Sequence, residues 1–135
     1  MTDAKSSQAA RAEQARRNKE LITKFYDLAI NKKDFAAARA YMGPYYRQHS
    51  TYGADGPEGL RQFVEWAKVN IPDLHVDFVR IIADGNYVLM HNRGKNSPET
   101  KAVVDIFRIE DGKVVEHWDV LQDVPPTAKN ANSMF

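Results

Sequence analysis

Apolar residues repeat with two different spacings along the chain, and the spacing changes near Pro72. Before this point apolar positions recur three or four residues apart, which is typical of amphipathic helices. After it, runs of β-branched and aromatic residues follow a period of two, which is typical of strands. The pattern predicts a helical first half and a strand-rich second half, the arrangement of an α+β domain.

Three helices are predicted in the first half. The first spans residues 8–30, and its apolar stripe is confined to its C-terminal half. Asp34 is a good N-cap for a short second helix through about Tyr41. The third begins at Asp55-Gly56-Pro57-Glu58, with proline at the first helical position, and ends at Ile71-Pro72-Asp73. The predicted buried faces carry Leu21, Phe25 and Leu28 in the first helix and Leu60, Phe63, Val64 and Ala67 in the third.

Four strands are predicted in the second half, arranged as two hairpins. Residues 75–83 and 87–92 flank the turn signal Asp84-Gly85-Asn86, and residues 101–109 and 114–122 flank Glu110-Asp111-Gly112-Lys113. A polar turn over residues 94–99 joins the two hairpins. We therefore expect three N-terminal helices packed on one face of a curved antiparallel sheet.

The turn of the second hairpin decides which of its side chains share a face. A two-residue turn on Asp111-Gly112 would place Asp105 opposite Trp118, whereas a three-residue loop with a left-handed Gly112 would place Asp105 opposite His117. Asp-Gly suits the first turn, and Gly-Lys after a type I pair suits the second. We favour the three-residue loop. Its pairing places on one face Val103, Asp105, Phe107, Val115, His117, Asp119 and Leu121.

Asp105, His117 and Asp119 then lie together among apolar neighbours. Burying an unpaired charge is unfavourable, so such groups are paired, neutralised or functional. A carboxyl group in an apolar pocket has a raised pKa, which suits it to move protons near neutral pH. The alternative is a cross-strand Asp105–His117 pair on a solvated face, with a structural role only.

Composition limits the other kinds of chemistry. The 135 residues suffice for one domain, with residues 1–7 as a disordered lead-in and residues 8–135 as the folded unit. Without cysteine there is no disulfide, thiolate metal site or cysteine nucleophile. Neither a membrane-spanning run nor a signal peptide is evident, so we expect a cytoplasmic protein with no membrane partner.

The charge is unevenly distributed, although the formal net charge is only +1. Basic residues are in excess in the first predicted helix, which raises the question of nucleic-acid binding. Acidic residues are interleaved with them, however, and no aromatic residues alternate with them to stack on bases. We interpret this segment as a solvated helix face and expect no nucleic-acid partner.

Several segments resemble SnoaL-like proteins. They are the hairpin from Ala102 to Gln122, the segment Tyr46-Arg-Gln-His49 and the segment Gly56-Pro-Glu-Gly-Leu-Arg-Gln-Phe63. The C-terminal Asn130-Ala-Asn-Ser-Met-Phe135 resembles the branch described as SnoaL-like aldol-condensation-catalysing enzymes. The resemblance implies a nuclear-transport-factor-2-like cone, in which three helices and a bent sheet enclose one pocket, commonly in a homodimer.

The resemblance also implies a function. Polyketide cyclases of this group close a ring by aldol condensation without a metal or cofactor. Ketosteroid isomerases share the fold and also combine a base that removes an α-proton with donors that hold the enolate oxygen. By motif position, Asp119 resembles the acid/base aspartate of the cyclases and Asp105 the oxyanion-hole aspartate of the isomerases. His117 would act between them as a donor or an orienting group, and Tyr26 has the residue type of the isomerases' oxyanion tyrosine.

Other residues are candidates for binding a small apolar carbonyl compound. His49 either lines the pocket mouth or anchors the loop that follows it, and Tyr46 forms part of the wall or acts as a donor. Phe107 and Val103 share the face of Asp105 in the favoured pairing. No metal site is expected: His117-x-Asp119 has the spacing of two facial-triad ligands, but no histidine follows residue 117. The alternatives to an enzyme are a silent ligand-binding module or a dimerisation module of the same fold.

Overall fold

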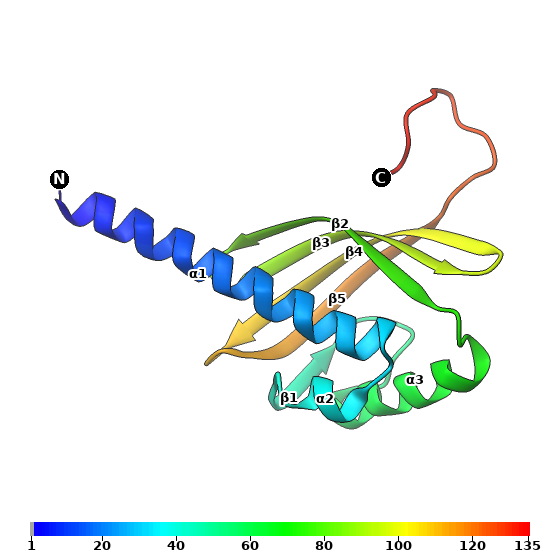
Figure 1. Cartoon of the computed structure of the whole chain (residues 1–135), viewed down its shortest axis with the longest axis horizontal. Coiled ribbons are helices and arrows are strands. Elements are labelled where there is room, and N and C mark those ends of the chain that lie inside the picture. Colours follow the sequence, from blue (N-terminus) through cyan, green and yellow to red (C-terminus); the bar gives the residue numbers. More distant parts are fainter. Residues whose placement is uncertain (1) are drawn as a thin grey trace.

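The computed structural model describes residues 2–135, and its helices and strands follow the predicted order with one added strand. The elements are α1 (Thr2–Tyr26), η1 (Asp27–Asn31), α2 (Phe35–Arg39), β1 (Met42–Gln48), α3 (Gly56–Asn70), β2 (His75–Asp84), β3 (Tyr87–Asn96), β4 (Glu99–Glu110) and β5 (Lys113–Asp123). The α+β prediction is confirmed. The three helices lie along one side of a curved sheet (Figure 1).

The sheet has the order β1-β5-β4-β3-β2. Neighbouring strands are antiparallel from β2 to β5, as expected, but the edge strand β1 runs parallel to β5. The sheet is therefore mixed rather than purely antiparallel. The pattern did not predict β1 because Gly43-Pro44 indicated a break in the chain. As an edge strand it tolerates the proline, which needs no ladder partner there.

The first helix differs from its prediction at its start. It already begins at Thr2, so residues 2–7 are helical rather than a disordered lead-in, and Met1 lies outside the described residues. Alanine-rich sequence favours this helix, and Asp3 in its first turn complements the helix dipole. The N-terminal part extends beyond the sheet (Figure 1), and the first buried side chain is that of Asn18. No helix within residues 2–135 is long and apolar enough to span a membrane.

The core lies between the helices and the concave face of the sheet. The predicted stripe of α1 contributes Phe25, which is fully buried, and α3 contributes Leu60, Val64 and Ala67. The predicted N-cap is confirmed, because the Asp34 carboxylate accepts a hydrogen bond from the Ala37 backbone N–H at 3.0 Å. Strand side chains complete the core: Tyr46, Val76, Val88, Met90, Phe107, Ile109 and Val114.

The β4–β5 hairpin closes with a two-residue turn, so the predicted three-residue loop is wrong. Glu110 pairs with Lys113, and the two turn residues Asp111 and Gly112 have φ values of 51° and 70°. Positive φ at both central positions is the type I′ geometry, which matches the twist of the flanking strands. Asp tolerates the left-handed conformation and Gly adopts it freely.

A bulge in β5 nevertheless restores most of the predicted face. The register shifts between Arg108 and Ile109, which pair with Glu116 and Val114, so Val115 is the extra residue. Asp105 consequently lies opposite Asp119 rather than Trp118 or His117. After the bulge, the β5 residues on the face of Asp105 are the predicted ones: His117, Asp119 and Leu121. Before it, Val114 rather than Val115 joins the core cluster.

The C-terminal segment after β5 packs on the outer face of the sheet. The ring of Phe135 stacks on that of His91 with 6.0 Å between centroids, and the Arg93 guanidinium lies 4.3 Å from the Phe135 ring centroid. Both partners belong to β3 and alternate with the buried Met90 and Asn92. The C-terminus therefore lies outside the concave side of the sheet and does not fill it.

Candidate functional site

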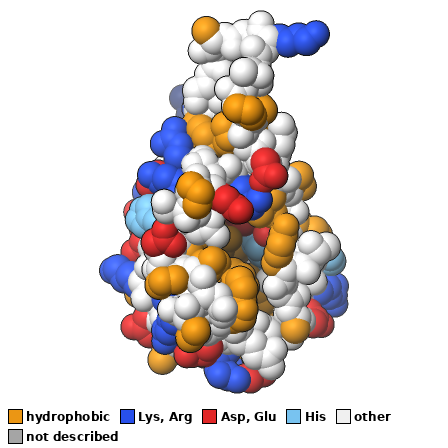
Figure 2. Space-filling view, turned by 90° about the vertical axis from the view of Figure 1, so that its right-hand side faces the viewer, with side chains coloured by type: hydrophobic (Ala, Val, Ile, Leu, Met, Phe, Trp, Pro, Cys, Tyr) orange, Lys and Arg blue, Asp and Glu red, His pale blue; other side chains and the backbone are white. Residues whose placement is uncertain are grey.

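A cavity of about 380 Å³ lies between the concave face of the sheet, α1 and α3. The space-filling view shows a hollow with hydrophobic side chains around it, on the side of the molecule that faces right in Figure 1 (Figure 2). Its wall is mostly apolar and aromatic. Contributors include Leu60 and Phe63 from α3, Leu74 just before β2, and Val76 near the start of β2. Such a lining suits an apolar ligand held by a few polar groups.

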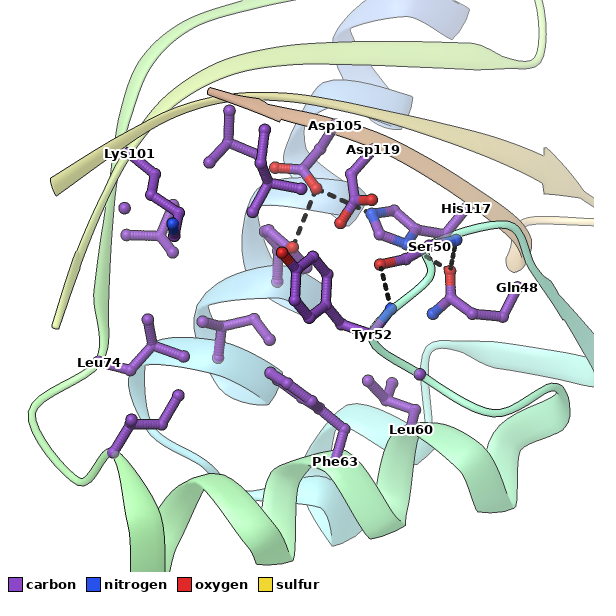
Figure 3. A pocket seen from close by; sticks show the side chains of 18 of the residues that line it. Gln48, Ser50, Tyr52, Leu60, Phe63, Leu74, Lys101, Asp105, His117 and Asp119 are labelled. Carbon is purple, nitrogen blue, oxygen red and sulfur yellow. Dashed lines mark hydrogen bonds and ion pairs between the residues drawn. The ribbon is translucent and has the colours of Figure 1, made fainter. Parts of the chain in front are cut away.

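A cluster of polar groups lies at one end of the cavity, apart from Lys101 (Figure 3). Asp105 comes from β4, His117 and Asp119 from β5, and all three line the cavity, as expected from their shared face. One ligand-type atom from each lies within 4.8 Å of the others. The structure thus brings together the three residues that the sequence singled out, by means of the β5 bulge.

Asp105 is 1% exposed and its two oxygens have three donors. The Tyr26 hydroxyl donates to Oδ1 at 3.0 Å, the Asn92 amide donates to Oδ2 at 2.8 Å, and His117 Nε2 lies 2.8 Å from Oδ1. A buried carboxylate with donors on both oxygens is well stabilised. Its hydrogen bonds orient Tyr26 and His117, and its own oxygens are occupied within the protein.

His117 is held between two acceptors. Its Nε2 faces Asp105, and its Nδ1 lies 2.8 Å from Oε1 of Gln48 at the end of β1. Both ring nitrogens therefore face side-chain oxygen atoms. The stacked ring of Tyr46, 6.4 Å away, further restricts the imidazole. His117 is therefore fixed in place by contacts from β1 and β4.

Asp119 differs from Asp105 in being half-buried and facing the cavity (Figure 3). Burial raises the pKa of its carboxyl group, and the nearby Asp105 charge acts in the same direction. The charge of His117 and the Ser50 hydroxyl oppose the shift without cancelling it. The site therefore holds two carboxyl groups in unlike surroundings, one enclosed by donors and one open to a ligand.

Two tyrosines line the cavity beside this cluster. Burial, reinforced by the charge of Asp105, raises the pKa of both Tyr26 and Tyr46 well above the usual value. Both remain neutral phenols at physiological pH. Tyr26, the last residue of α1, donates directly to Asp105 on β4.

The remaining predicted residues divide between the cavity and its surroundings. Val103 lines the cavity, whereas Phe107 is fully buried beneath it and packs edge-on to Tyr26 at 5.0 Å. His49 is not among the cavity-lining residues. Its Nε2 lies 2.6 Å from Glu116, and its ring stacks on Trp118 at 4.7 Å, on the outer face of the sheet.

The Glu116 carboxylate explains that outward position of His49. Burial alone would raise the pKa of Glu116, but hydrogen bonds from His49 and Arg108 outweigh burial and lower it. Arg108 donates from Nε at 2.8 Å. His49 thus contacts the Glu116–Arg108 pair next to the end of β1, rather than lining the cavity mouth.

Gln48 and Ser50 are two of the polar cavity residues that sequence reasoning missed. Tyr46 and Gln48 lie two positions apart, which places them on the same face once β1 is recognised as a strand. The only pattern that could have identified them was this alternation, and Gly43-Pro44 obscured it. Both residues depend on the parallel pairing of β1 with β5.

Asp105, His117 and Asp119 form the one group of three metal-type ligands within residues 2–135. The two His117 nitrogens and both Asp105 oxygens already make hydrogen bonds inside the protein. An ion could be bound there only by breaking these bonds. The donor set therefore fits a hydrogen-bonded network better than a metal centre.

Solved structures with the same fold support this assignment of the architecture. A candidate ketosteroid isomerase from Kribbella flavida is 15% identical with a TM-score of 0.69, covering 90% of this chain and 91% of its own. IdmH, a candidate polyketide cyclase from Streptomyces antibioticus, is 18% identical with a TM-score of 0.66, covering 77% and 91%. TsrD from Streptomyces laurentii is 21% identical with a TM-score of 0.66, covering 78% and 88%.

No curated protein matches the sequence. The family model of the SnoaL-like domain, in contrast, matches residues 22–117, well over half of the chain. The match includes Tyr26, Gln48, Asp105 and His117, and it ends two residues before Asp119. Together with the cone-shaped arrangement of three helices and a curved sheet, this match shows that the chain belongs to the SnoaL-like domain family, with a nuclear-transport-factor-2-like fold.

Proposed function

We propose that this protein binds a small apolar carbonyl compound and transfers a proton at the carbon next to the carbonyl group, in an aldol-type cyclisation or an isomerisation. The observation that carries the proposal is Asp119, a half-buried carboxyl group with a raised pKa that faces an apolar cavity. A base with a pKa closer to the working pH transfers protons more efficiently. The candidate cyclase and isomerase among the structural neighbours agree with this chemistry.

In the proposed reaction Asp119 removes the α-proton, and the electrons of the broken C–H bond form an enolate. The enolate carbon then attacks a second carbonyl carbon of the same ligand, and the proton held by Asp119 passes to the new alkoxide. In an isomerisation the proton returns to a different carbon instead. Asp105 and His117 hold the polar end of the cavity in a fixed geometry, so that no reorganisation is needed during the reaction.

The alternative is a binding module without catalysis, which the largely apolar cavity wall would also serve. Deuterium exchange at the α-carbon of ketones such as 1-tetralone, followed by NMR in D₂O, distinguishes the two. We expect the wild type to accelerate exchange and Asp119→Asn to lose about 10²–10⁴-fold of that acceleration, the usual contribution of general acid–base catalysis. Asp84→Asn, at an exposed site, is the matched control. Equal exchange by wild type and Asp119→Asn would exclude Asp119 as the base.

We also propose that the protein forms a homodimer through the outer face of its sheet. Large apolar side chains are exposed on this face, with Ile82 at 59% and Val120 at 70%. Trp118 lies on the same face of β5 as Val120. Contiguous exposed apolar residues on a sheet are typical of interaction surfaces.

A further inference from the structure

The side-chain amide of Gln48 has only one orientation compatible with its neighbours. Its Oε1 atom accepts the backbone N–H of Ser50 at 3.1 Å and lies 2.8 Å from His117 Nδ1. Turning the amide over would place Nε2 against the Ser50 N–H, two donors facing each other. The Oε1 atom is therefore engaged by Ser50 and His117, and the Nε2 group points away from both partners (Figure 3).

The Nε2 group lies at the wall of the cavity, of which Gln48 is a part. Gly53 lies beside it, and a Cβ atom at that position would come 3.5 Å from Nε2. Tyr46 is its other polar neighbour, and the phenol oxygen can take one of the two N–H groups. One N–H donor of Gln48 therefore remains for a ligand.

Most of the other donors at this end of the cavity are already used, and the Tyr46 hydroxyl is the exception. The Tyr26 hydroxyl and the Asn92 amide donate to Asp105, and His117 is engaged at both nitrogens. The Ser50 hydroxyl interacts with Asp119. Gln48 and the neighbouring Tyr46 hydroxyl thus keep donor capacity, and Gln48 lies on the opposite side of His117 from Asp105.

We propose that Gln48 is a substrate-binding residue, whose Nε2 amide donates a hydrogen bond to the carbonyl oxygen of the ligand. The ligand class is accordingly a ketone or an enone. This assignment rests on the proposed function: when Asp119 removes the α-proton, negative charge moves to the oxygen, and the Gln48 N–H stabilises the resulting oxyanion. Asp119 and Gln48 both flank His117, so a base and an oxygen donor converge on neighbouring atoms of one ligand.

Two variants separate the donor role of Gln48 from its structural role. Gln48→Glu keeps an oxygen for Ser50 and His117 but replaces the N–H₂ group with a second acceptor. Gln48→Met removes the donor without adding charge, and it also removes the acceptor. Gln122→Glu and Gln122→Met, at an exposed position near the end of β5, are the matched controls.

The probes are 1-tetralone, a bicyclic ketone, and tetralin, the same molecule without the oxygen. We expect the wild type to bind the ketone more tightly than the hydrocarbon, measured by calorimetry. Both Gln48 variants should lose about 2- to 12-fold in ketone affinity, the value of one hydrogen bond, with tetralin binding unchanged in Gln48→Glu. The bound carbonyl stretch should also move to higher wavenumber in both variants.

Unchanged ketone affinity in Gln48→Glu, or failure of the wild type to bind 1-tetralone, would overturn the assignment. The proposed function has a separate readout, which is deuterium exchange at the α-carbon of the same ketone. Gln48-dependent binding without any exchange would refute the catalysis and leave the carbonyl-binding role of Gln48 in place. Exchange that is insensitive to both Gln48 variants would refute that role and leave the catalysis in place.

Discussion

Asp105 and Asp119 lie directly opposite each other on β4 and β5, yet their carboxyl groups have different surroundings. Asp105 is enclosed by Tyr26, Asn92 and His117, whereas Asp119 faces the cavity. Two like charges on facing positions destabilise a sheet unless each is compensated. Hydrogen-bond donors compensate the charge of Asp105, whereas the pKa of Asp119 is raised. Acid–base chemistry commonly uses two carboxyl groups in such unlike surroundings.

The raised pKa of Asp119 predicts a gain in stability when its charge is removed. A carboxyl group whose pKa is higher in the folded state favours folding below its unfolded pKa and loses that contribution as pH rises through its folded pKa. At pH 7 the wild type therefore holds an unfavourable charge that Asp119→Asn lacks. Urea unfolding should show a more stable variant at pH 7 and a smaller difference near pH 4. A variant that is less stable at pH 7 would contradict this prediction.

Asn92 should be sensitive to the smallest change of its side chain. Its Nδ2 group donates to Asp105, while Oδ1 is the only buried side-chain polar atom without a partner in the described chain. Asn92→Asp would place a second carboxyl group against Asp105, which we expect to lower the free energy of unfolding by about 3 kcal/mol or more at pH 7. The loss should shrink as the pH is lowered, because protonating one of two adjacent carboxyl groups removes their repulsion. Asn132→Asp, at an exposed site, should leave stability unchanged.

The two cavity tyrosines should respond differently to loss of their hydroxyl groups. Tyr26 donates to a buried carboxylate, so Tyr26→Phe should destabilise the protein by about 1–3 kcal/mol. Tyr46 is more deeply buried but makes no hydrogen bond to a carboxylate, so Tyr46→Phe should cost about 1 kcal/mol or less. Chemical denaturation of both variants at pH 7 measures the difference. Equal losses would mean that the Tyr26–Asp105 contact does not stabilise the fold.

The type I′ turn predicts that Gly112 is required for stability although it is exposed. Its φ of 70° is left-handed, so Gly112→Ala should destabilise the protein by about 1 kcal/mol. Gly94→Ala is the control, because a Cβ atom there would meet Val103 at an ordinary 3.6 Å. Thermal unfolding should place the Gly112 variant below the wild type and the Gly94 variant at or above it.

Assembly through the outer sheet face predicts that one charge on that face disrupts the dimer. Val120→Glu should shift the protein to the monomer in sedimentation velocity, because a buried unpaired carboxylate opposes association. Val69→Glu changes a valine on α3 that is even more exposed, at 80%, and should leave the assembly unchanged. A monomeric wild type, or a Val120→Glu dimer, would refute the proposed interface.

The sequence by itself determined the local structure. Helix caps and apolar spacings located the three helices, because capping and burial of one helix face depend on residues a few positions apart. The two β-turns likewise located both hairpins. The shared face of Asp105, His117 and Asp119 was also predicted, although through the wrong turn: a bulge at Val115 compensates for the shorter loop.

Only the tertiary structure decided how distant segments meet. The parallel pairing of β1 with β5 joins residues about seventy positions apart, and no local pattern encodes such a contact. That pairing brings Gln48 to His117 and turns His49 toward Glu116 on the other face. The packing of α1 across the sheet similarly brings Tyr26 to Asp105. Side-chain periodicity tells which residues face inward, whereas the hydrogen-bond partner of each depends on long-range packing.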